Sequence, residues 1–348
     1  MSKLGRDILV QGILVRLDVK DVLRCTSVCK LWRFLIISPL NTFTKLHLNH
    51  NINNNNHNTT TKRVRISNNP KQDDHRIMYH IEHPYRTILV GSCNGLVCIS
   101  SSPCHLYVAN PFTREVIKIQ ESSPISHMPD ILAIVISYWG FGYDSSTDDY
   151  KIVLGIYLKS VTNFHVLSLK TKVWKFLGSQ PCMLTTKAAT FFNGVLHWLI
   201  GNQNNKRRIL TFDLSREEFK EYRLPDIVPD PKLGVAKGCL CLFDYGELPS
   251  DIVWLMKEYY VQQSWTLVPF VPDKRDDEKE AIHFYDLDKK YPRNKGVFHT
   301  DHIIMSSTWE ALLDPIFVPS LVSPRVIYTS SLKRKREPAE NNDTAAKV

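Results

Sequence analysis

The chain has 348 residues, a length typical of about two domains of roughly 150 residues each. Apolar residues make up 43% and charged residues 23%, which excludes wholesale disorder, a collagen-like chain and a small disulfide scaffold. The formal net charge is +9. Part of this excess comes from four consecutive cations at residues 333–336 and the rest is scattered, so we expect no nucleic-acid-binding face.

The cysteines and the N-terminus predict a reduced, intracellular protein. The eight cysteines form no Cys-x-x-Cys pair that would complete a zinc-ligand set with histidines, so we expect free thiols, no metal site and no cofactor. The first residues include Lys3, Arg6 and Asp7 and lack the apolar segment of a signal peptide. The longest apolar run, residues 131–143, is too short and too interrupted to span a bilayer.

Residues 1–48 carry three apolar stripes at helical spacing. The first lies within residues 7–17, with Asp7 as its expected N-cap, and the second helix is expected to start near Asp21. Pro39 ends the third helix because proline disfavours helix at the preceding residue. Three such short helices cannot bury their apolar faces alone and need a partner surface. The apolar positions of the third helix are Val28, Leu31, Trp32, Leu35 and Ile36.

The composition changes sharply after the helical part. Residues 49–85 contain Asn and Thr tracts with little to bury, so we expect a disordered linker or surface loop. From Ile88 the apolar period becomes 2, and turn glycines recur at intervals of about 40–50 residues, the blade period of a β-propeller. Residues 86–330 are therefore expected to form five or six blades, followed by a disordered basic tail over 331–348. The turn glycines are Gly95, Gly142, Gly194 and Gly238.

Two sets of motifs occur in order along the chain. The N-terminal set comprises Leu4, Ile13–Leu14, Arg16–Leu17, Val19–Lys20, Leu23, Val28–Cys29–Lys30, Trp32, Leu35–Ile36 and Ser38–Pro39. The C-terminal set comprises residues 91–97, the Asn-Pro-x-Thr-Arg motif of 110–114, residues 140–144 with 148–151, residues 193–198, and residues 254–259 with 264–265. Together they resemble plant F-box proteins with an F-box-associated domain, often called F-box/kelch-repeat proteins. Gly5 and Asp18 stand where that family usually has proline.

The resemblance implies an α+β multidomain fold, with a three-helix F-box over 1–48 followed by an all-β, kelch-like β-propeller over 86–330. It implies a non-catalytic substrate-recognition subunit of a Skp–cullin–F-box E3 ubiquitin ligase. The F-box would bind the Skp-type adaptor, and through it the cullin and RING subunits, while the β domain would bind an unknown target protein. The expected adaptor-binding residues are Leu4, Ile13, Leu14, Leu17, Val19, Leu23, Val28, Cys29, Trp32 and Leu35.

Other functions stay open on the sequence alone. An enzyme is disfavoured because the chain lacks nucleophile-elbow, phosphate-loop and zinc-protease motifs. Adjacent acids such as Asp148–Asp149 point to opposite faces of a strand, and His197 beside Trp198 is expected to pack rather than catalyse. A ligase-independent propeller scaffold with a degenerate F-box is a second candidate. Within the ligase class, a pollen determinant of self-incompatibility has the same architecture.

The basic tail bears on where the protein is located in the cell, and the variable loops bear on how it binds its target. Four consecutive cations followed by a polar stretch resemble a nuclear import signal, although a solubilising tail is an equal reading, so we expect a cytoplasmic and/or nuclear protein. The target is expected to bind at propeller loops, with residues 121–130, 201–208 and 229–233 as candidates, and neither membrane nor nucleic acid is expected as a partner. The cationic residues are Lys333, Arg334, Lys335 and Arg336.

Overall fold

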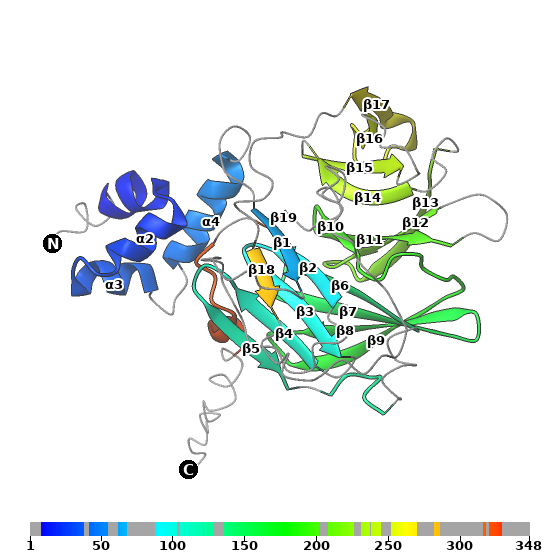
Figure 1. The fold of residues 1–348 in the computed structure, drawn as a ribbon, viewed down its shortest axis with the longest axis horizontal. Coiled ribbons are helices and arrows are strands. Elements are labelled where there is room, and N and C mark those ends of the chain that lie inside the picture. The colour runs from blue at the N-terminus through cyan, green and yellow to red at the C-terminus, as the bar shows by residue number, and fades with distance from the viewer. Residues whose placement is uncertain are drawn as a thin grey trace, which may run out of the picture.

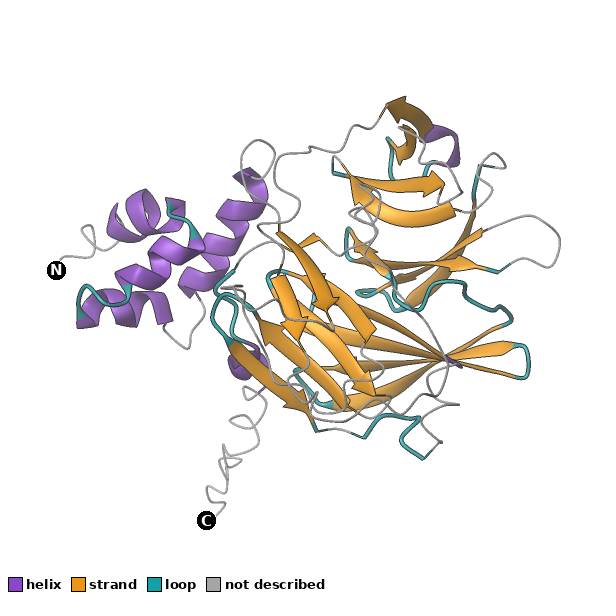
Figure 2. Cartoon of the chain, in the orientation of Figure 1, coloured by secondary structure: helices purple, strands orange, loops and turns teal. Residues whose placement is uncertain are grey.

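The fold is described from a computed structural model. The residues that it describes are 8–37, 42–54, 62–67, 88–102, 105–120, 122–127, 136–201, 208–225, 231–236, 238–244, 252–269, 282–285, 316–317 and 320–328. Helices come first along the chain and strands follow, with the helices lying to one side of the sheets (Figures 1 and 2). The helical segments are η1 (Ile8–Ile13), η2 (Leu14–Arg16), α2 (Val19–Cys25), α3 (Lys30–Ile37) and α4 (Thr42–Asn54).

The first segment, η1, is a π-helical turn that runs into the 3-10 turn η2, not the α-helix that the apolar stripe predicts. Leu9 and Leu14 are both buried. Ile13, which α spacing places on that same face, is 49% exposed.

The second helix, α2, begins two residues earlier than predicted, with Asp18 rather than Asp21 as its N-cap. Asp18 Oδ1 accepts a hydrogen bond from the Asp21 backbone N–H at 2.7 Å, which satisfies one of the free donors of the first turn. The residue that stands in place of the usual proline thus caps the helix. The next helix, α3, ends at Ile37, as Pro39 predicts.

Helix α4 continues past residue 48 and connects the two parts of the molecule. Phe43 is buried in the core of the preceding helices, whereas Leu48 is buried in the core of the first sheet. The linker prediction is therefore wrong for residues 49–54, and also for the strand β1 (Lys62–Ser67). The asparagines of this range are poor helix formers, but packing of the helix against both cores outweighs their low propensity.

Four four-stranded antiparallel sheets follow, as the two-residue period predicts. Their strands are β2 (Ile88–Cys93), β3 (Leu96–Ser102), β4 (His105–Asn110) and β5 (Glu115–Ile119); β6 (Ser137–Asp144), β7 (Asp149–Leu158), β8 (Val161–Ser168) and β9 (Val173–Gln180); β10 (Thr190–Phe192), β11 (Val195–Ile200), β12 (Arg208–Asp213) and β13 (Glu218–Arg223); and β14 (Pro231–Ala236), β15 (Cys239–Asp244), β16 (Ile252–Met256) and β17 (Trp265–Pro269). A 3-10 turn, η4 (Gln262–Ser264), precedes β17.

A further three-stranded sheet combines strands from both ends of the β region. Its central strand, β1, pairs in parallel with β18 (Ile282–Tyr285) and antiparallel with β19 (Ile316–Phe317). Both β1 and β19 also lie against β2 of the first sheet. The sequence predicts five or six blades; among the described residues there are four four-stranded sheets and this three-stranded one.

Successive sheets pack face to face through separate apolar cores. One core joins the first two sheets and includes Trp139 and Phe141, and the next joins the second and third sheets around Phe164 and Trp198. A third core, which includes Leu240, joins the third and fourth sheets. Because each sheet buries its faces on its neighbours, the repeat is stable only as a series.

The glycine repeat of the sequence is correct at three of its four positions. Gly95, Gly194 and Gly238 have positive φ angles between 68° and 77° and lie at the turns between the first two strands of their sheets. Gly142 instead lies inside β6, where an added Cβ would approach the Phe191 ring to 2.5 Å. It permits close packing of β6 on the third sheet and does not form a turn.

Candidate functional site

The N-terminal helices form a small module with its own apolar core. The buried histidine His47 lies on α4, with its Nε2 2.8 Å from the Leu17 carbonyl oxygen, so this nitrogen carries a proton and donates. Burial lowers the pKa of His47, which keeps the ring neutral. The buried apolar side chains of the core are Leu9, Leu14, Val15, Val19, Val22, Ile36, Phe43 and, from the far end of the chain, Leu321.

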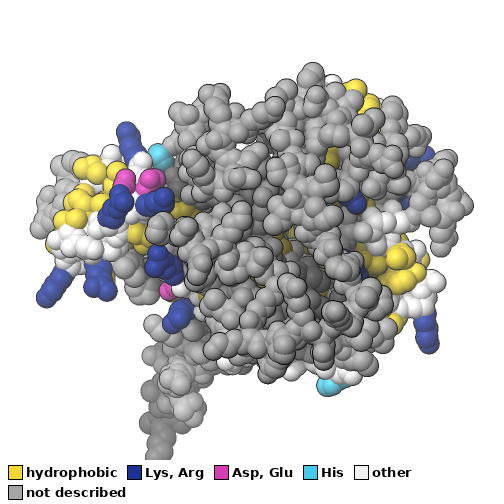
Figure 3. All heavy atoms as spheres, viewed as in Figure 1, with side chains coloured by type: hydrophobic (Ala, Val, Ile, Leu, Met, Phe, Trp, Pro, Cys, Tyr) yellow, Lys and Arg dark blue, Asp and Glu magenta, His cyan; other side chains and the backbone are white. Residues whose placement is uncertain are grey.

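The same module leaves large apolar side chains open to solvent. Val28 and Phe34 are each 63% exposed, and Ile13 is 49% exposed. Single exposed apolar residues are ordinary, but several on one small module indicate an interaction surface. Figure 3 shows hydrophobic side chains gathered over the helices at the left of the molecule, among Lys and Arg.

The residues predicted to contact an adaptor fall into three groups by exposure. Leu14 and Val19 are buried and support the module from inside. Leu4 lies outside the described residues. The half-buried members are Leu17, Leu23, Trp32 and Leu35, and the exposed members are Ile13, Val28 and Cys29. The exposed and half-buried members are the ones placed where a partner protein can reach them, and their contact with an adaptor stays a prediction.

Phe34 is the exposed residue that sequence reasoning missed. Phe34 falls outside the predicted apolar stripe of the third helix, which comprises Val28, Leu31, Trp32, Leu35 and Ile36. An aromatic residue on the side of an amphipathic helix that does not face its core has no folding role to explain it. That signal was present in the sequence and points to binding.

Positive charge surrounds these apolar side chains. Every Lys and Arg described between residues 8 and 37 is exposed, and the only acids in the same range are Asp18 and Asp21. Arg24 pairs with Asp21 at 2.7 Å, which leaves the other cations of the module without an ion pair among the described acids of these helices. The electrostatics favour a partner whose contact surface carries carboxylates. The exposed cations are Arg16, Lys20, Arg24, Lys30 and Arg33.

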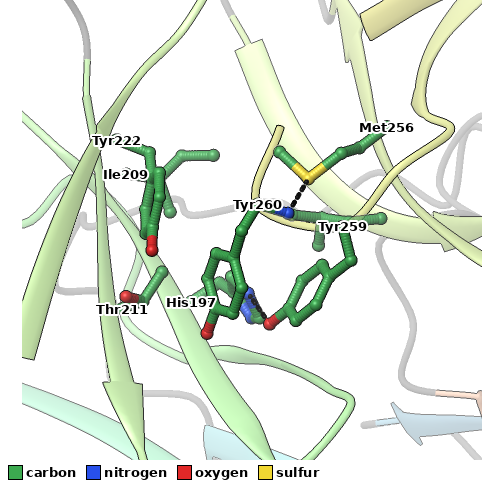
Figure 4. Close-up of a pocket in the computed structure, with 8 residues that line it drawn as sticks. His197, Ile209, Thr211, Tyr222, Met256, Tyr259 and Tyr260 are labelled. Atoms are coloured by element: carbon green, nitrogen blue, oxygen red, sulfur yellow. Dashed lines mark hydrogen bonds between the residues drawn. The ribbon is translucent and has the colours of Figure 1, made fainter. Parts of the chain in front are cut away.

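A small cavity lies between the third and fourth sheets (Figure 4). Its volume is about 10 Å³, enough for one water molecule at most and too small for an organic ligand. Tyr222 and Tyr260 stack beside it with ring centroids 4.9 Å apart. The lining residues are His197, Ile209, Thr211, Tyr222, Leu240, Met256, Tyr259 and Tyr260.

The histidine at this cavity has a packing role. His197 is 1% exposed, and its Nδ1 lies 3.1 Å from the Thr190 carbonyl oxygen, so Nδ1 carries the proton. Its Nε2 therefore accepts the hydrogen bond from the Tyr259 hydroxyl at 2.9 Å. Burial lowers the pKa of His197 to about 4. Both ring nitrogens are occupied and the ring is neutral, so the geometry leaves no free base for catalysis.

The described part of the chain contains no group of three or more potential metal ligands. Within the same residues no helix has the length and apolar content needed to cross a bilayer. The described cysteines are all free thiols, and Cys93, Cys98, Cys182 and Cys241 are buried. Burial raises the pKa of Cys93 and Cys98, which makes both thiols poor nucleophiles.

Comparison with known proteins assigns both parts of the chain. Residues 7–44 match the F-box domain, and residues 40–266 match the F-box associated beta propeller domain. The second match begins at α4, which agrees with the packing of that helix on the first sheet.

The chain is also similar to whole F-box proteins of Arabidopsis thaliana. It is 31% identical to the F-box protein CPR1, over 83% of this chain and 79% of the relative. The F-box/kelch-repeat protein At3g23880 is 28% identical, over 77% of this chain and 79% of the relative.

The chain thus combines a helical F-box module with a β domain of repeated four-stranded sheets. The chain belongs to the family of plant F-box proteins with an F-box associated beta propeller domain. F-box domains generally bind Skp1-type adaptors, and members of this family are generally non-catalytic substrate receptors.

Proposed function

We propose that this protein is the target-recognition subunit of a Skp–cullin–F-box ubiquitin ligase, with no catalytic residue of its own. The observation that carries the proposal is the exposed apolar surface of the F-box module around Phe34 and Val28, bordered by cations. Such a surface fits an apolar groove of the adaptor with acidic edges. Cullin and RING subunits would then join through the adaptor.

The test is direct binding of the purified full chain to a Skp-type adaptor by calorimetry. A saturable 1:1 complex whose affinity falls with rising salt supports the proposal, because the cationic border should contribute through screened charges. Lack of binding at all salt concentrations would favour a ligase-independent scaffold. The choice between a general receptor and a self-incompatibility determinant depends on the target.

For the β domain we propose a propeller closed by the three-stranded sheet β18-β1-β19. Support comes from its strands, which derive from both ends of the β region, and from its contact with β2. A chain cut after Asp213 should be insoluble, because an interrupted ring exposes whole sheet faces. A soluble, folded product would contradict closure.

We propose the variable loops as the target-binding region; about half of their residues lie outside the described ones, and residues 231–233, predicted as part of a loop, belong instead to strand β14. Exchange of residues 201–208 for a Gly-Ser segment of equal length should alter which proteins are captured by proximity labelling, without a change in adaptor affinity. Unchanged capture would remove this loop from the target site.

We also propose a nuclear pool of the protein. The basic run at 333–336 lies outside the described residues, and its sequence alone supports this proposal. Alanine at Lys333, Arg334, Lys335 and Arg336 should shift a fluorescent fusion toward the cytoplasm with no change in melting temperature. An unchanged nuclear fraction would reduce the run to a solubilising tail.

A further inference from the structure

The Asn-Pro-x-Thr-Arg motif has a structural role that neither adaptor binding nor target binding explains. Asn110 ends β4 and is fully buried. Its Oδ1 accepts from the backbone N–H groups of Phe112 and Thr113 and so forms the β4–β5 turn. Its Nδ2 donates hydrogen bonds outside this turn.

That amide group holds a segment from the far end of the chain. Asn110 Nδ2 donates to the Ser320 carbonyl oxygen at 2.9 Å and to the Val322 carbonyl oxygen at 2.7 Å. Ser320 Oγ in turn donates to the Asn94 carbonyl oxygen at 2.6 Å. Gly95 is required beside it, because an added Cβ would lie 2.2 Å from Ser320 Oγ. We call residues 320–328 the C-terminal clasp.

The clasp contacts both modules at once. Leu321 is 8% exposed and belongs to the core of the F-box helices, with Phe112 of the Asn-Pro turn packed against it. Val322 and Tyr328 belong to the core of the first two sheets. Figure 1 shows this orange-to-red segment between the helices and the β4–β5 edge.

The far end of the clasp is fixed by contacts of a different kind. The Gln120 backbone N–H donates to the Tyr328 hydroxyl oxygen at 3.1 Å. Lys172 Nζ lies 3.9 Å from the centroid of the Tyr328 ring, within cation–π range. Asn110 therefore holds the clasp at residues 320–322, and the first two sheets hold it at Tyr328. Leu321, which contacts the F-box helices, lies near the first of these two points.

A second, independent connection joins the modules on another side. Lys45 of α4 lies 2.5 Å from Asp148 in the β6–β7 turn, and both side chains are about half exposed. Such an exposed pair is weak by itself. The buried clasp and the buried Leu48 of α4 thus provide most of the attachment.

We propose that the C-terminal clasp fixes the F-box module in one orientation on the β domain, and that Asn110 is the positioning residue that holds the clasp. The functional consequence rests on the proposed ligase function: a receptor must present its bound target at a set distance from the ubiquitin-carrying subunit. An opened clasp leaves the adaptor surface and the β domain intact but lets one move relative to the other. Transfer geometry is then lost while both binding events survive.

The matched test is Asn110→Asp in the full-length chain. An aspartate keeps the Oδ1 acceptor of the turn but replaces the donor with an oxygen, so the clasp contact is lost and the buried carboxylate repels the two carbonyl groups that it faces. Asp213→Asn is the control, because Asp213 forms the equivalent turn of the third sheet, accepting from Ser215 and Arg216, at a site remote from the clasp. Leu321→Asp is a second variant that opens the clasp from the F-box side.

Amide hydrogen exchange and an inter-module distance give the first readout. Exchange at residues 321–328 should rise at least tenfold in Asn110→Asp, with β3 unchanged. Spin labels at Cys29 and at Val173→Cys, with Cys25, Cys104 and Cys239 replaced by serine, should give one narrow distance in the parent and a broad distribution in Asn110→Asp and Leu321→Asp. Clasp exchange equal to that of Asp213→Asn, or an unchanged narrow distance in both clasp variants, would overturn the proposal.

The functional readout uses self-ubiquitination, which needs no identified target. In a reconstituted ligase at saturating adaptor, the lysines modified on the receptor should shift from a restricted set to a scattered set in Asn110→Asp, with adaptor affinity within twofold of the parent. The same restricted set in parent and variant would overturn the positioning role. Failure of the parent to bind adaptor would instead refute the proposed function, while the distance measurement still decides whether the clasp holds the modules.

Discussion

Lys151 and Asp144 form a buried ion pair on the second sheet, and the Lys151 ammonium also contacts the third sheet. Lys151 Nζ lies 3.0 Å from Asp144 Oδ2, and the two side chains are 8% and 0% exposed. The same ammonium donates to the Leu214 carbonyl oxygen at 2.7 Å and to Glu217 at 3.1 Å, both in the β12–β13 turn. The contacts from Lys151 to Leu214 and Glu217 thus cross the boundary between adjacent sheets.

Hydrogen bonds keep the carboxylate of this pair charged. Burial alone would raise the pKa of Asp144, but donors from Ser146, Ser215, Lys151 and Thr147 outweigh it and hold the pKa well below its usual range. Removal of the ammonium would therefore leave a charged group buried without its counter-ion.

We predict that Lys151→Met lowers the free energy of unfolding by about 3–5 kcal/mol, since it breaks a buried pair from one side. Lys175→Met is the matched control: Lys175 pairs with the same Glu217 but is 64% exposed, so its loss should cost less than about 1 kcal/mol. Urea denaturation measures both. An equal loss of unfolding free energy in the two variants would show that the buried Lys151 stabilises the fold no more than the exposed Lys175.

Stability should fall in mild acid because of His197. Its pKa is about 4 in the folded protein, below the usual value near 6.5, so the unfolded chain binds more protons between these pH values. The stability contributed by the neutral ring is complete above about pH 6.5 and is lost as pH falls toward 4. We expect the free energy of unfolding to fall by about 2 kcal/mol between pH 7 and pH 5.

The control for this effect is His197→Gln, which cannot titrate in that window. It should be less stable at pH 7, because glutamine does not reproduce the packing of the buried ring with its two hydrogen bonds, yet its stability should depend less on pH. His47 is present in both proteins, so its contribution cancels in the difference. If the stability of parent and variant depended on pH in the same way, His197 would not be the group responsible for the loss in acid.

Asp18 should stabilise the F-box through its cap. Asp18→Ala should cost about 1 kcal/mol, visible as faster hydrogen exchange in α2, whereas Asp18→Asn should keep most of the protection. Proline, the usual family residue, fits the φ of −68° but removes the cap, so we expect no net gain from it. Equal exchange in the Ala and Asn variants would show that the side chain does not cap.

How much the sequence predicts depends on whether a feature is local. The hairpins at Asn94–Gly95 and Asn193–Gly194 follow from two-residue turns that need positive φ, and each turn can be read from adjacent residues. The family match confirms the F-box and the associated β domain that the motifs indicated.

The features that sequence reasoning missed depend on distant contacts. Asn110 and Ser320 are 210 residues apart, and no sequence pattern at either position predicts contact with the other. Helix α4 lacks a clear apolar stripe because its buried residues face two different cores. The linker expected from residue 49 onward failed at residues 49–54 for this reason, since α4 and the clasp both contact the two modules.

The measurement that tests the central claim is adaptor affinity of the full-length protein with Phe34→Ala beside Phe176→Ala. Phe34 is 63% exposed on the F-box and Phe176 is 56% exposed on the second sheet, so truncation of either should leave folding nearly unchanged. We predict a 1:1 complex of the parent with a Skp-type adaptor, about 30-fold weaker with Phe34→Ala (about 2 kcal/mol) and unaltered with Phe176→Ala. A parent protein that does not bind the adaptor, or two variants that bind it equally well, would contradict the ligase account.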